Sequence, residues 1–384
     1  MIYLDNHATT ACDPRVVAAM IPFFSEGYGN ASSPHGFGQA AAAAVDAAQA
    51  QVATLLGGEP EEIVFTSGAT ESNNLALLGA ARRHEQWGGT RRRLVTTAIE
   101  HKSVLAPLEH LAELGWDLVY LPIDETGRVR LDQARELITE ETLLVSVQAA
   151  NSEIGTIQPI AELAELAHTR GALMHCDASQ AIGKIALGVT QLGVDLLSLS
   201  GHKMYGPKGI GALWIRGGGL QLPLVPLMYG GGHAGGLRSG TLPVPLIVGL
   251  GMASELAEEQ LASESQRTAA LRDEFEKHLC EELAAIAVNG AVEQRLPNNT
   301  SLTFNGLDAE ALLANLPEIV ASTGAACESG SVEPSRVLLA LGLSREQAFS
   351  TLRFGLGRFT TAEEMRAAAE LLIAAYRQLA LLLA

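Results

Sequence analysis

The chain has 384 residues, 47% hydrophobic and 18% charged, so it can fold into two domains with sizeable cores and is not a disordered protein. Its 43 acidic and 26 basic residues leave a formal net charge of −17, which argues against nucleic acid or an anionic membrane as the main partner. There is no charged leader before an apolar region, and no apolar run approaches the ~20 residues of a membrane span, so a cytoplasmic protein is expected.

The first sixty residues predict a short strand and two helices. Residues 1–10 combine an apolar strand with a polar turn. A helix is expected from Asp13, which can cap it, through Pro14 at the first helical position to about Phe24. Residues 27–38 are rich in Gly, Ser, Asn and Pro and predict a loop. The alanine-rich residues 39–56 then predict a second helix, closed by two glycines.

The small residues at 66–74 follow a predicted strand at 63–65 and lead into a helix. Small residues let several backbone N–H groups converge at a helix N-terminus, where these groups and the helix dipole favour a phosphate. The alternative is an ordinary helix capped by a Ser or Thr side chain. By themselves these residues support both interpretations about equally.

Further apolar strands are predicted at 94–97, 118–121, 143–147, 172–176, 196–199 and 212–215, separated by helical lengths. This alternation predicts an α/β fold in which a mostly parallel sheet is sandwiched by helices. Ligands bind at the carboxyl ends of the strands in such sheets. One shared site is therefore expected for the polar residues that directly follow strands, which are Thr70, His101, Asn151, Asp177, Gln180 and Lys203.

Lys203 and Asp177 indicate the chemistry of that site. Lys203 lies on a turn after a strand, because Gly206 and Pro207 forbid a regular helix there. A lysine held in this way can be a desolvated amine that forms a Schiff base, and an aspartate at another strand end can pair with a pyridinium nitrogen. The pair suggests pyridoxal 5′-phosphate as cofactor. Taken alone, Lys203 would be read as a solvated loop lysine.

The C-terminal part predicts a second, smaller α/β domain. A glycine-rich connector at 230–236 and a long helix from about 246 to 285 lead to a strand at 300–304, a helix at 309–316, a strand at 318–322 and a final helix that reaches Ala384. The predicted domains are a large cofactor-binding domain at 14–250 and a small domain at 251–384, with residues 1–13 joining the small one.

The four cysteines are too far apart for a zinc site or a disulfide framework. Cys327 lies in a loop of small residues, which favours a reactive thiol over a buried structural one. Cys176 lies within an apolar strand and is expected in the core. Arg353 and Arg358 flank glycines on a predicted strand, where an arginine could clamp a carboxylate or form an ion pair between domains.

These motifs resemble those of the group I cysteine desulfurases, pyridoxal-phosphate enzymes of aminotransferase fold type I. The resemblance runs almost end to end in the family's order, through residues 3–10, 66–74, 100–103, 151–155, 177–180, 200–209, 238–241, 327–335 and 353–354. It implies that L-cysteine is converted to L-alanine and that its sulfur passes to an enzyme cysteine as a persulfide, which supplies iron–sulfur cluster assembly.

The resemblance also implies roles for single residues. Lys203 would carry the cofactor as an internal aldimine and move the α-carbon proton, while Asp177 would pair with the pyridinium nitrogen and His101 would stack on the ring. Cys327 would attack the substrate sulfur, and it is also a candidate transient ligand of an iron–sulfur cluster; no other metal ligand is predicted. Thr70, Ser200, His202 and, from the second subunit of a homodimer, Thr241 are implied to hold the phosphate, and Gln180 the ring hydroxyl. Ala69 and Asn151 are also implied to bind the cofactor, and Asn151 and Arg353 the substrate carboxylate.

The predicted partners are L-cysteine, a sulfur-acceptor or iron–sulfur scaffold protein, and a second copy of the chain. One alternative is a selenocysteine lyase or a class V aminotransferase, which would differ in substrate. Another is a non-enzymatic carrier that holds a persulfide or a cluster on Cys327 and binds no pyridoxal phosphate. An ordinary transaminase needs no such cysteine, so Cys327 decides between the reactions.

Overall fold

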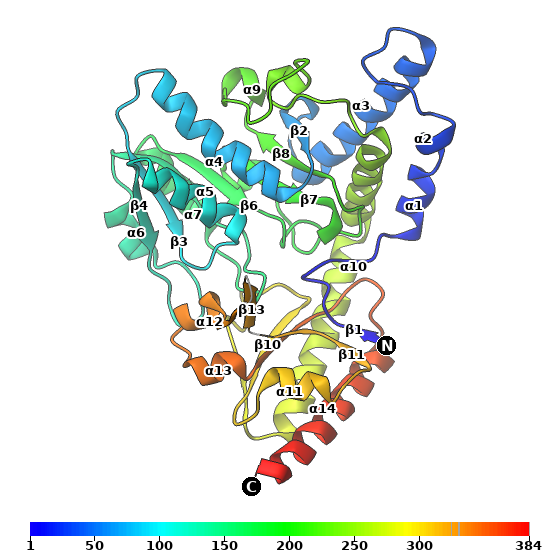
Figure 1. Cartoon of the computed structure of the whole chain (residues 1–384), viewed down its shortest axis with the longest axis vertical. Coiled ribbons are helices and arrows are strands. Elements are labelled where there is room, and N and C mark those ends of the chain that lie inside the picture. The colour runs from blue at the N-terminus through cyan, green and yellow to red at the C-terminus, as the bar shows by residue number, and fades with distance from the viewer. Residues whose placement is uncertain (324, 329–330, 384) are drawn as a thin grey trace.

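Seven strands form the central sheet of the protein (Figure 1). In this computed structural model, residues 1–323, 325–328 and 331–383 are described, with side chains for all of them except 325–328, 331–332 and 383. The spatial order of the strands is β2 (Ile63–Thr66), β8 (Gly211–Ile215), β7 (Leu196–Ser200), β6 (Leu173–Asp177), β5 (Thr142–Ser146), β3 (Arg93–Thr97) and β4 (Asp117–Leu121). Only β8 runs antiparallel to its neighbours in this sheet, so the predicted mostly parallel sheet is confirmed.

Helices cover both faces of this sheet, as predicted. One face packs against α3 (Gly36–Leu56), α7 (Ile160–Thr169) and the first half of α10 (Val244–Glu282), and the other against α4 (Ala69–Gln86) and α5 (Lys102–Glu113). Successive residues of a strand point to opposite faces. Cys176 of β6 is therefore fully buried on the α3 side, which confirms the core prediction, while Asp177 faces the α4 and α5 side.

A second core lies in the C-terminal part of the chain. A four-stranded antiparallel sheet has the order β12 (Ser322–Thr323), β15 (Thr351–Gly355), β10 (Asn299–Phe304) and β9 (Ile286–Val288). The core beside it is built with α11 (Ala309–Ala314), α14 (Ala362–Leu383) and the second half of α10. β1 (Ile2–Tyr3) pairs with β11 (Ile319–Val320), and Leu4 lies in this core, so the N-terminal residues join the C-terminal part.

Helix α10 belongs to both cores. Its 39 residues extend about 58 Å at 1.5 Å per residue. Ile247 and Leu250 pack in the first core, and Phe275 and Leu279 pack in the second. Figure 1 shows the helix passing from the upper to the lower part of the molecule. The predicted domain boundary at residue 250 falls inside this helix and stays a prediction.

Short elements connect these parts. They are α1 (Pro14–Met20), α2 (Pro22–Ser25), η1 (Pro60–Glu62), α6 (Leu131–Leu137), α8 (Val189–Leu192), η2 (Gly201–Lys203), α9 (Gly218–Gln221), η3 (Ala234–Gly236), β13 (Ala325–Glu328), β14 (Ser331–Pro334), α12 (Arg336–Ala340) and α13 (Arg345–Phe349).

Three predicted elements differ from the structure. The single helix expected from Pro14 to Phe24 is two helices, because Pro22 has no N–H group with which to continue α1. The strand expected at 318–322 is divided into β11 and β12 around Ala321. Helix α3 begins at Gly36, three residues early, since the His35 side chain accepts a hydrogen bond from the N–H of Gly38 and caps the helix.

Candidate active site

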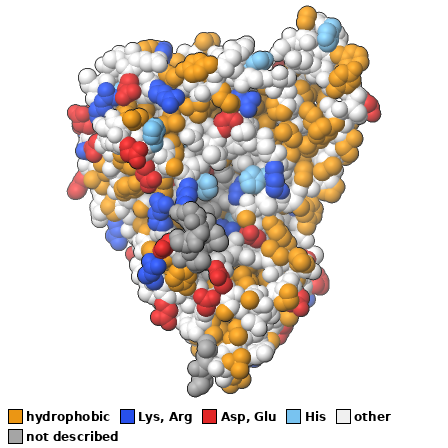
Figure 2. Space-filling view, in the orientation of Figure 1, with side chains coloured by type: hydrophobic (Ala, Val, Ile, Leu, Met, Phe, Trp, Pro, Cys, Tyr) orange, Lys and Arg blue, Asp and Glu red, His pale blue; other side chains and the backbone are white. Residues whose placement is uncertain are grey.

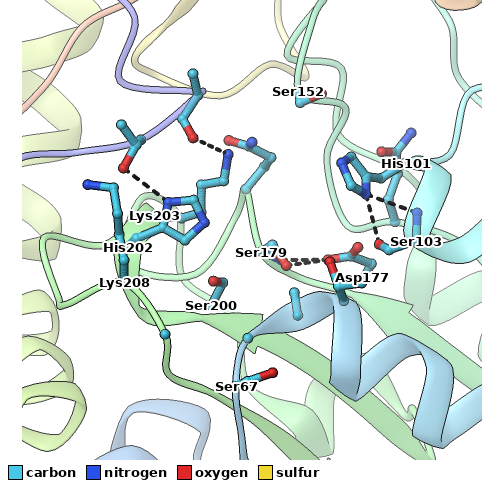
Figure 3. A pocket seen from close by; sticks show the side chains of 18 of the residues that line it. Ser67, His101, Ser103, Ser152, Asp177, Ser179, Ser200, His202, Lys203 and Lys208 are labelled. Carbon is cyan, nitrogen blue, oxygen red and sulfur yellow. Dashed lines mark hydrogen bonds between the residues drawn. The ribbon is translucent and has the colours of Figure 1, made fainter. Parts of the chain in front are cut away.

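A cavity of about 560 Å³ lies at the carboxyl ends of the central strands. Figure 3 shows Lys203 and His202 on one side of it, and His101 with Asp177 below it on the other. On the face in Figure 2, basic and histidine side chains gather near the middle of the molecule despite its negative net charge. The cavity is lined by eight predicted site residues, which are Ala69, Thr70, His101, Asp177, Gln180, Ser200, His202 and Lys203.

Lys203 ends η2, directly after β7, and its amine points to the N-terminal segment. Nζ donates a hydrogen bond to the backbone oxygen of His7 and another to that of Ala8, at 2.9 Å for the latter. Burial, followed by the positive charge of Arg353, lowers the pKa of Lys203 from 10.5 to about 8. Far more of this amine is therefore neutral at pH 7 than in a solvated lysine.

Asp177 is fixed by hydrogen bonds to both of its carboxylate oxygens. Oδ1 accepts from the N–H of Ser179 at 3.0 Å and from its Oγ at 2.5 Å, and Oδ2 accepts from Asn73 Nδ2 at 2.8 Å. Asn73 Nδ2 also donates to Ser103 Oγ at 2.8 Å. Asn73 comes from the second turn of α4 and Ser103 from the first turn of α5, the two helices that cover this face of the sheet.

His101 continues this hydrogen-bond chain and caps α5. Its Nδ1 accepts the N–H of Ser103 at 3.1 Å and lies 2.8 Å from Ser103 Oγ. A nitrogen that accepts from a backbone N–H carries no proton, so we assign the proton of the neutral ring to Nε2. Burial lowers the pKa of His101, and Lys203 and Lys102 lower it further, whereas Asp177 raises it.

The N-terminus of α4 forms one wall of the cavity. Its N-cap residue is Gly68, with φ +149°, and no side chain caps the helix. Ser67 and Gly68 line the cavity together with Ala69 and Thr70, and Lys208 completes the lining nearby. Uncapped N–H groups next to a lysine favour an anion, so the structure supports the phosphate interpretation over that of a Ser- or Thr-capped helix.

Of the two residues His202 and Thr241, both predicted at the phosphate, only His202 lines the cavity of the described chain. His202 Nδ1 lies 3.1 Å from Thr9 Oγ1, and burial, followed by three nearby lysines, lowers the pKa of His202 to about 4. Thr241 is exposed and does not line the cavity of its own chain. Its predicted contact from a second subunit stays a prediction.

Asn151 is fully buried and does not line the cavity. Its Nδ2 donates to the backbone oxygen of Ile99 at 3.0 Å, and its Oδ1 accepts the N–H groups of Glu153 and Ile154. In this arrangement Asn151 shapes the turn after β5. Its predicted contacts with cofactor and substrate stay predictions.

Arg353 of β15 lies behind the rim of the cavity. Its Nη2 donates to Asp5 Oδ1 at 2.7 Å and to Ser322 Oγ at 2.8 Å, and its Nη1 donates to the backbone oxygen of Ser152 at 3.2 Å. Ser152 lines the cavity, whereas Arg353 does not. The guanidinium is thus held one residue away from the space where a substrate carboxylate is predicted.

Arg358 forms ion pairs, which is the second of the two roles predicted for it. Its Nη1 lies 2.9 Å from Asp13 Oδ2, its Nε lies 2.8 Å from Glu264 Oε2, and its guanidinium carbon lies 4.2 Å from the centre of the Tyr205 ring. This buried network ties the end of β15 to α10 and to the turn that carries Lys203.

Cys327 is placed by its backbone alone. It lies in β13, which pairs with β14 in an antiparallel ladder. The side chain is outside the described residues, and so are the predicted catalytic and cluster-binding roles of Cys327. Among the described residues, no group of three or more His, Cys, Asp or Glu side chains is arranged to hold a metal ion.

A sequence model of the aminotransferase class-V family matches residues 2–367. Cysteine desulfurase IscS of Anaeromyxobacter dehalogenans (strain 2CP-C) is 47% identical over 365 residues, which are 95% of this chain and 89% of the relative. The chain belongs to the cysteine desulfurases of the class-V aminotransferase family. The corresponding enzyme of Rickettsia prowazekii (strain Madrid E) is 44% identical over 95% of this chain and 88% of its own length.

Solved structures of this family have the same fold. A NifS-like protein superimposes with a TM-score of 0.90 at 38% identity, covering 99% of both chains. SspA in complex with cysteine gives a TM-score of 0.83 at 38% identity, covering 94% of this chain and all of the other. The family and fold type predicted from the motifs are confirmed. No helix in the described part of this desulfurase is long and apolar enough to span a membrane.

Proposed function

We propose that this protein uses pyridoxal 5′-phosphate to convert L-cysteine to L-alanine and keeps the sulfur on Cys327 as a persulfide. The observation that carries the proposal is that an amine, a carboxylate and an uncapped helix N-terminus share one cavity. These are Lys203, Asp177 and the first turn of α4. The similarity to cysteine desulfurases supports this choice of reaction among those of the family.

The residues present fit the cofactor. The N-terminus of α4, with Ser200 and His202, would hold its phosphate, Asp177 its ring nitrogen, and the Nζ of Lys203 its aldehyde carbon. When bound, pyridoxal phosphate supplies an electron sink for negative charge on the substrate's α carbon. The hydrogen bonds from Asn73 and Ser179 hold the Asp177 carboxylate in place for this task.

Lys203 and His101 would handle protons. The depressed pKa of Lys203 leaves a share of neutral amine that can take a proton from the substrate's α carbon near neutral pH. His101 accepts hydrogen bonds at Nδ1 and so keeps an Nε2–H, which would be available as a donor beside the bound cofactor. The low pKa of His101 keeps it neutral, which suits stacking and donation rather than ion pairing.

Arg353 would bind the substrate's carboxylate. Within the described residues its Nε is buried without a hydrogen-bond partner, while Asp5 and Ser322 take both hydrogens of Nη2. A buried N–H without a partner is costly. The guanidinium also donates from Nη1 to the cavity residue Ser152, and an arginine in that place is suited to a substrate carboxylate.

The sulfur step needs a thiolate on Cys327. The thiolate attacks the sulfur of the bound substrate, the carbon–sulfur bond breaks and a sulfur–sulfur bond forms, and the substrate's β carbon then gains a proton to give alanine. A sulfur-acceptor protein, such as a scaffold for iron–sulfur clusters, would take the outer sulfur from the persulfide. A second copy of the chain would supply Thr241.

The test is a turnover assay with the cofactor-loaded protein, L-cysteine and a thiol reductant, in which alanine and sulfide are measured together. Equal amounts of both are expected, and Cys327→Ala should lose turnover. The control is Cys280→Ala, because Cys280 is an exposed cysteine on α10. Full turnover by Cys327→Ala, amino transfer to a keto acid, or strict dependence on selenocysteine would contradict the proposal.

A further inference from the structure

Lys184 is a buried lysine that the predicted chemistry does not use. It lies just after the turn that carries Asp177 and Gln180, and its exposed fraction is 6%. Within the described residues its amine makes one hydrogen bond, from Nζ to Gln180 Oε1 at 3.2 Å. A buried lysine with a single neutral acceptor is energetically costly, so its place beside a cavity residue calls for an explanation.

The Gln180 carboxamide can point in only one direction here. Its Oε1 faces the amine of Lys184 and lies 2.9 Å from His7 Nδ1, while its Nε2 donates to the backbone oxygen of His7 at 3.0 Å. Reversing the amide would set NH₂ against the Lys184 amine and oxygen against the His7 carbonyl. The second N–H of Gln180 thus remains for the cavity that this residue lines.

The same carbonyl connects two lysines. The His7 oxygen accepts from Lys203 Nζ as well as from Gln180 Nε2, so Lys184 is joined to Lys203 through Gln180 and His7. The two amines also repel each other, and this repulsion contributes to the low pKa of Lys184, about 7, after the larger effect of burial. The other charged groups that act on Lys184 are Glu264, which raises its pKa, and Arg353, which lowers it.

We propose that Lys184 is a positioning residue that orients and polarises the Gln180 carboxamide, so that a strengthened N–H donor faces the ring oxygen of the cofactor. The inference rests on the proposed function, because it needs pyridoxal phosphate in this cavity. An N–H donor on the amide oxygen withdraws electron density from the amide nitrogen, and hydrogen bonds in such a chain strengthen one another. A stronger donor would favour the ionised form of the ring oxygen.

A small cavity beside Lys184 offers a place for a partner of its remaining donors. It measures about 10 Å³, is lined by Lys184, Glu264 and Asn298 among others, and has room for about one water molecule. Asn298 Oδ1 is buried and has no partner within the described residues. A water there would bridge the Lys184 amine to Asn298 of the C-terminal part and hold the amine against Gln180.

The test compares Lys184→Met with Lys277→Met, since Lys277 is 75% exposed on α10. Lys184→Met should weaken the binding of pyridoxal phosphate roughly threefold to tenfold, as expected for one lost hydrogen bond. It should also raise the pH midpoint of the visible absorbance of the loaded protein. In the cofactor-free protein the pKa of Lys203, read from the pH dependence of its acetylation by mass spectrometry, should rise. Lys277→Met should match the wild type in all three.

A double-mutant cycle tests whether Lys184 acts through Gln180. In a Gln180→Ala background, Lys184→Met should weaken cofactor binding no further. Additive losses, or a Lys184→Met protein that matches the wild type in affinity and absorbance, would overturn the inference. Lys184→Gln replaces the methionine variant if that variant does not fold. If the wild-type protein does not bind pyridoxal phosphate, the proposed function is wrong. The pKa of Lys203 in the cofactor-free protein would then still test the link between Lys184 and Lys203.

Discussion

The two sides of the candidate active site are built differently. On the sheet side, Asp177 ends β6 and Lys203 lies three residues after β7, while the N-terminal parts of α4 and α5 hold Asp177 and His101. On the small-domain side, Arg353 of β15 is held by Asp5 from the N-terminal segment and by Ser322 of β12. One side comes from neighbouring strand ends, and the other is assembled from three distant parts of the chain.

The two sides of the site are therefore held in place in different ways. Strand register and helix packing set the sheet side before any ligand binds. The Arg353 side depends on ion pairs between segments, which a substrate carboxylate can rearrange. Substitutions on the sheet side should therefore impair the chemistry, and those on the Arg353 side should impair substrate binding.

The largest effect is expected for Lys203→Ala. Without this amine neither the cofactor linkage nor the transfer of the α-carbon proton is available, so kcat should fall about 10³-fold or more. Steady-state alanine production measures the loss, and the melting temperature of the cofactor-free protein serves as the folding control. A loss below tenfold would show that another group does this work.

Arg353→Gln should lower kcat/KM for L-cysteine about tenfold to a hundredfold, mainly through KM, because a charged hydrogen bond to the substrate is lost. The matched control is Arg366→Gln, since Arg366 is 64% exposed on α14. An unchanged KM with a reduced kcat would show that Arg353, like the sheet side, acts on the chemistry and not on substrate binding.

Asn73→Ala should weaken the retention of pyridoxal phosphate by roughly fivefold to tenfold, because Asp177 loses one of its buried hydrogen-bond donors. Equilibrium dialysis of the cofactor measures this change. Asn74→Ala is the neighbouring control, since within the described part of the chain Asn74 Nδ2 bonds only to the backbone oxygen of Thr70. Equal behaviour of the two variants would show that Asp177 does not need the hydrogen bond from α4.

Lys184 gives the smallest predicted effect, and it depends on pH. The pKa of Lys184 is about 7 in the folded protein and 10.5 ordinarily, so the unfolded chain binds more protons between these values and the stability contribution of Lys184 rises with pH. From pH 6 to 8 the wild type should gain roughly 1 kcal/mol relative to Lys184→Met. Urea unfolding of the cofactor-free proteins at both pH values measures it, and a pH-independent difference would contradict a buried, neutralised amine.

The sheet side could be predicted because its residues follow strands that are plain in the sequence. Asp177, His101 and Lys203 come one to four residues after apolar runs, and those strands end at one edge of the sheet. Asn73 and Ser103 were missed, since a polar residue inside a helix does not reveal its partner. Their only signal is a polar side chain in the first two turns of a helix that follows a site strand.

The Arg353 side could not be predicted in the same detail. Nothing in the sequence relates Asp5, Ser322 and Arg353, because their contact depends on how the N-terminal segment and the small domain pack together. Lys184 and His7 were missed for a related reason, as their link to Gln180 needs a bend of the chain beside the N-terminal segment.

Helix α10 has a mechanical consequence. An unbroken rod that is embedded in both hydrophobic cores cannot serve as a hinge, and pulling the cores apart would require bending or breaking it. If the proposed function is correct, the sulfur would therefore reach an outside acceptor by movement of a short stretch of backbone rather than by opening of the whole molecule.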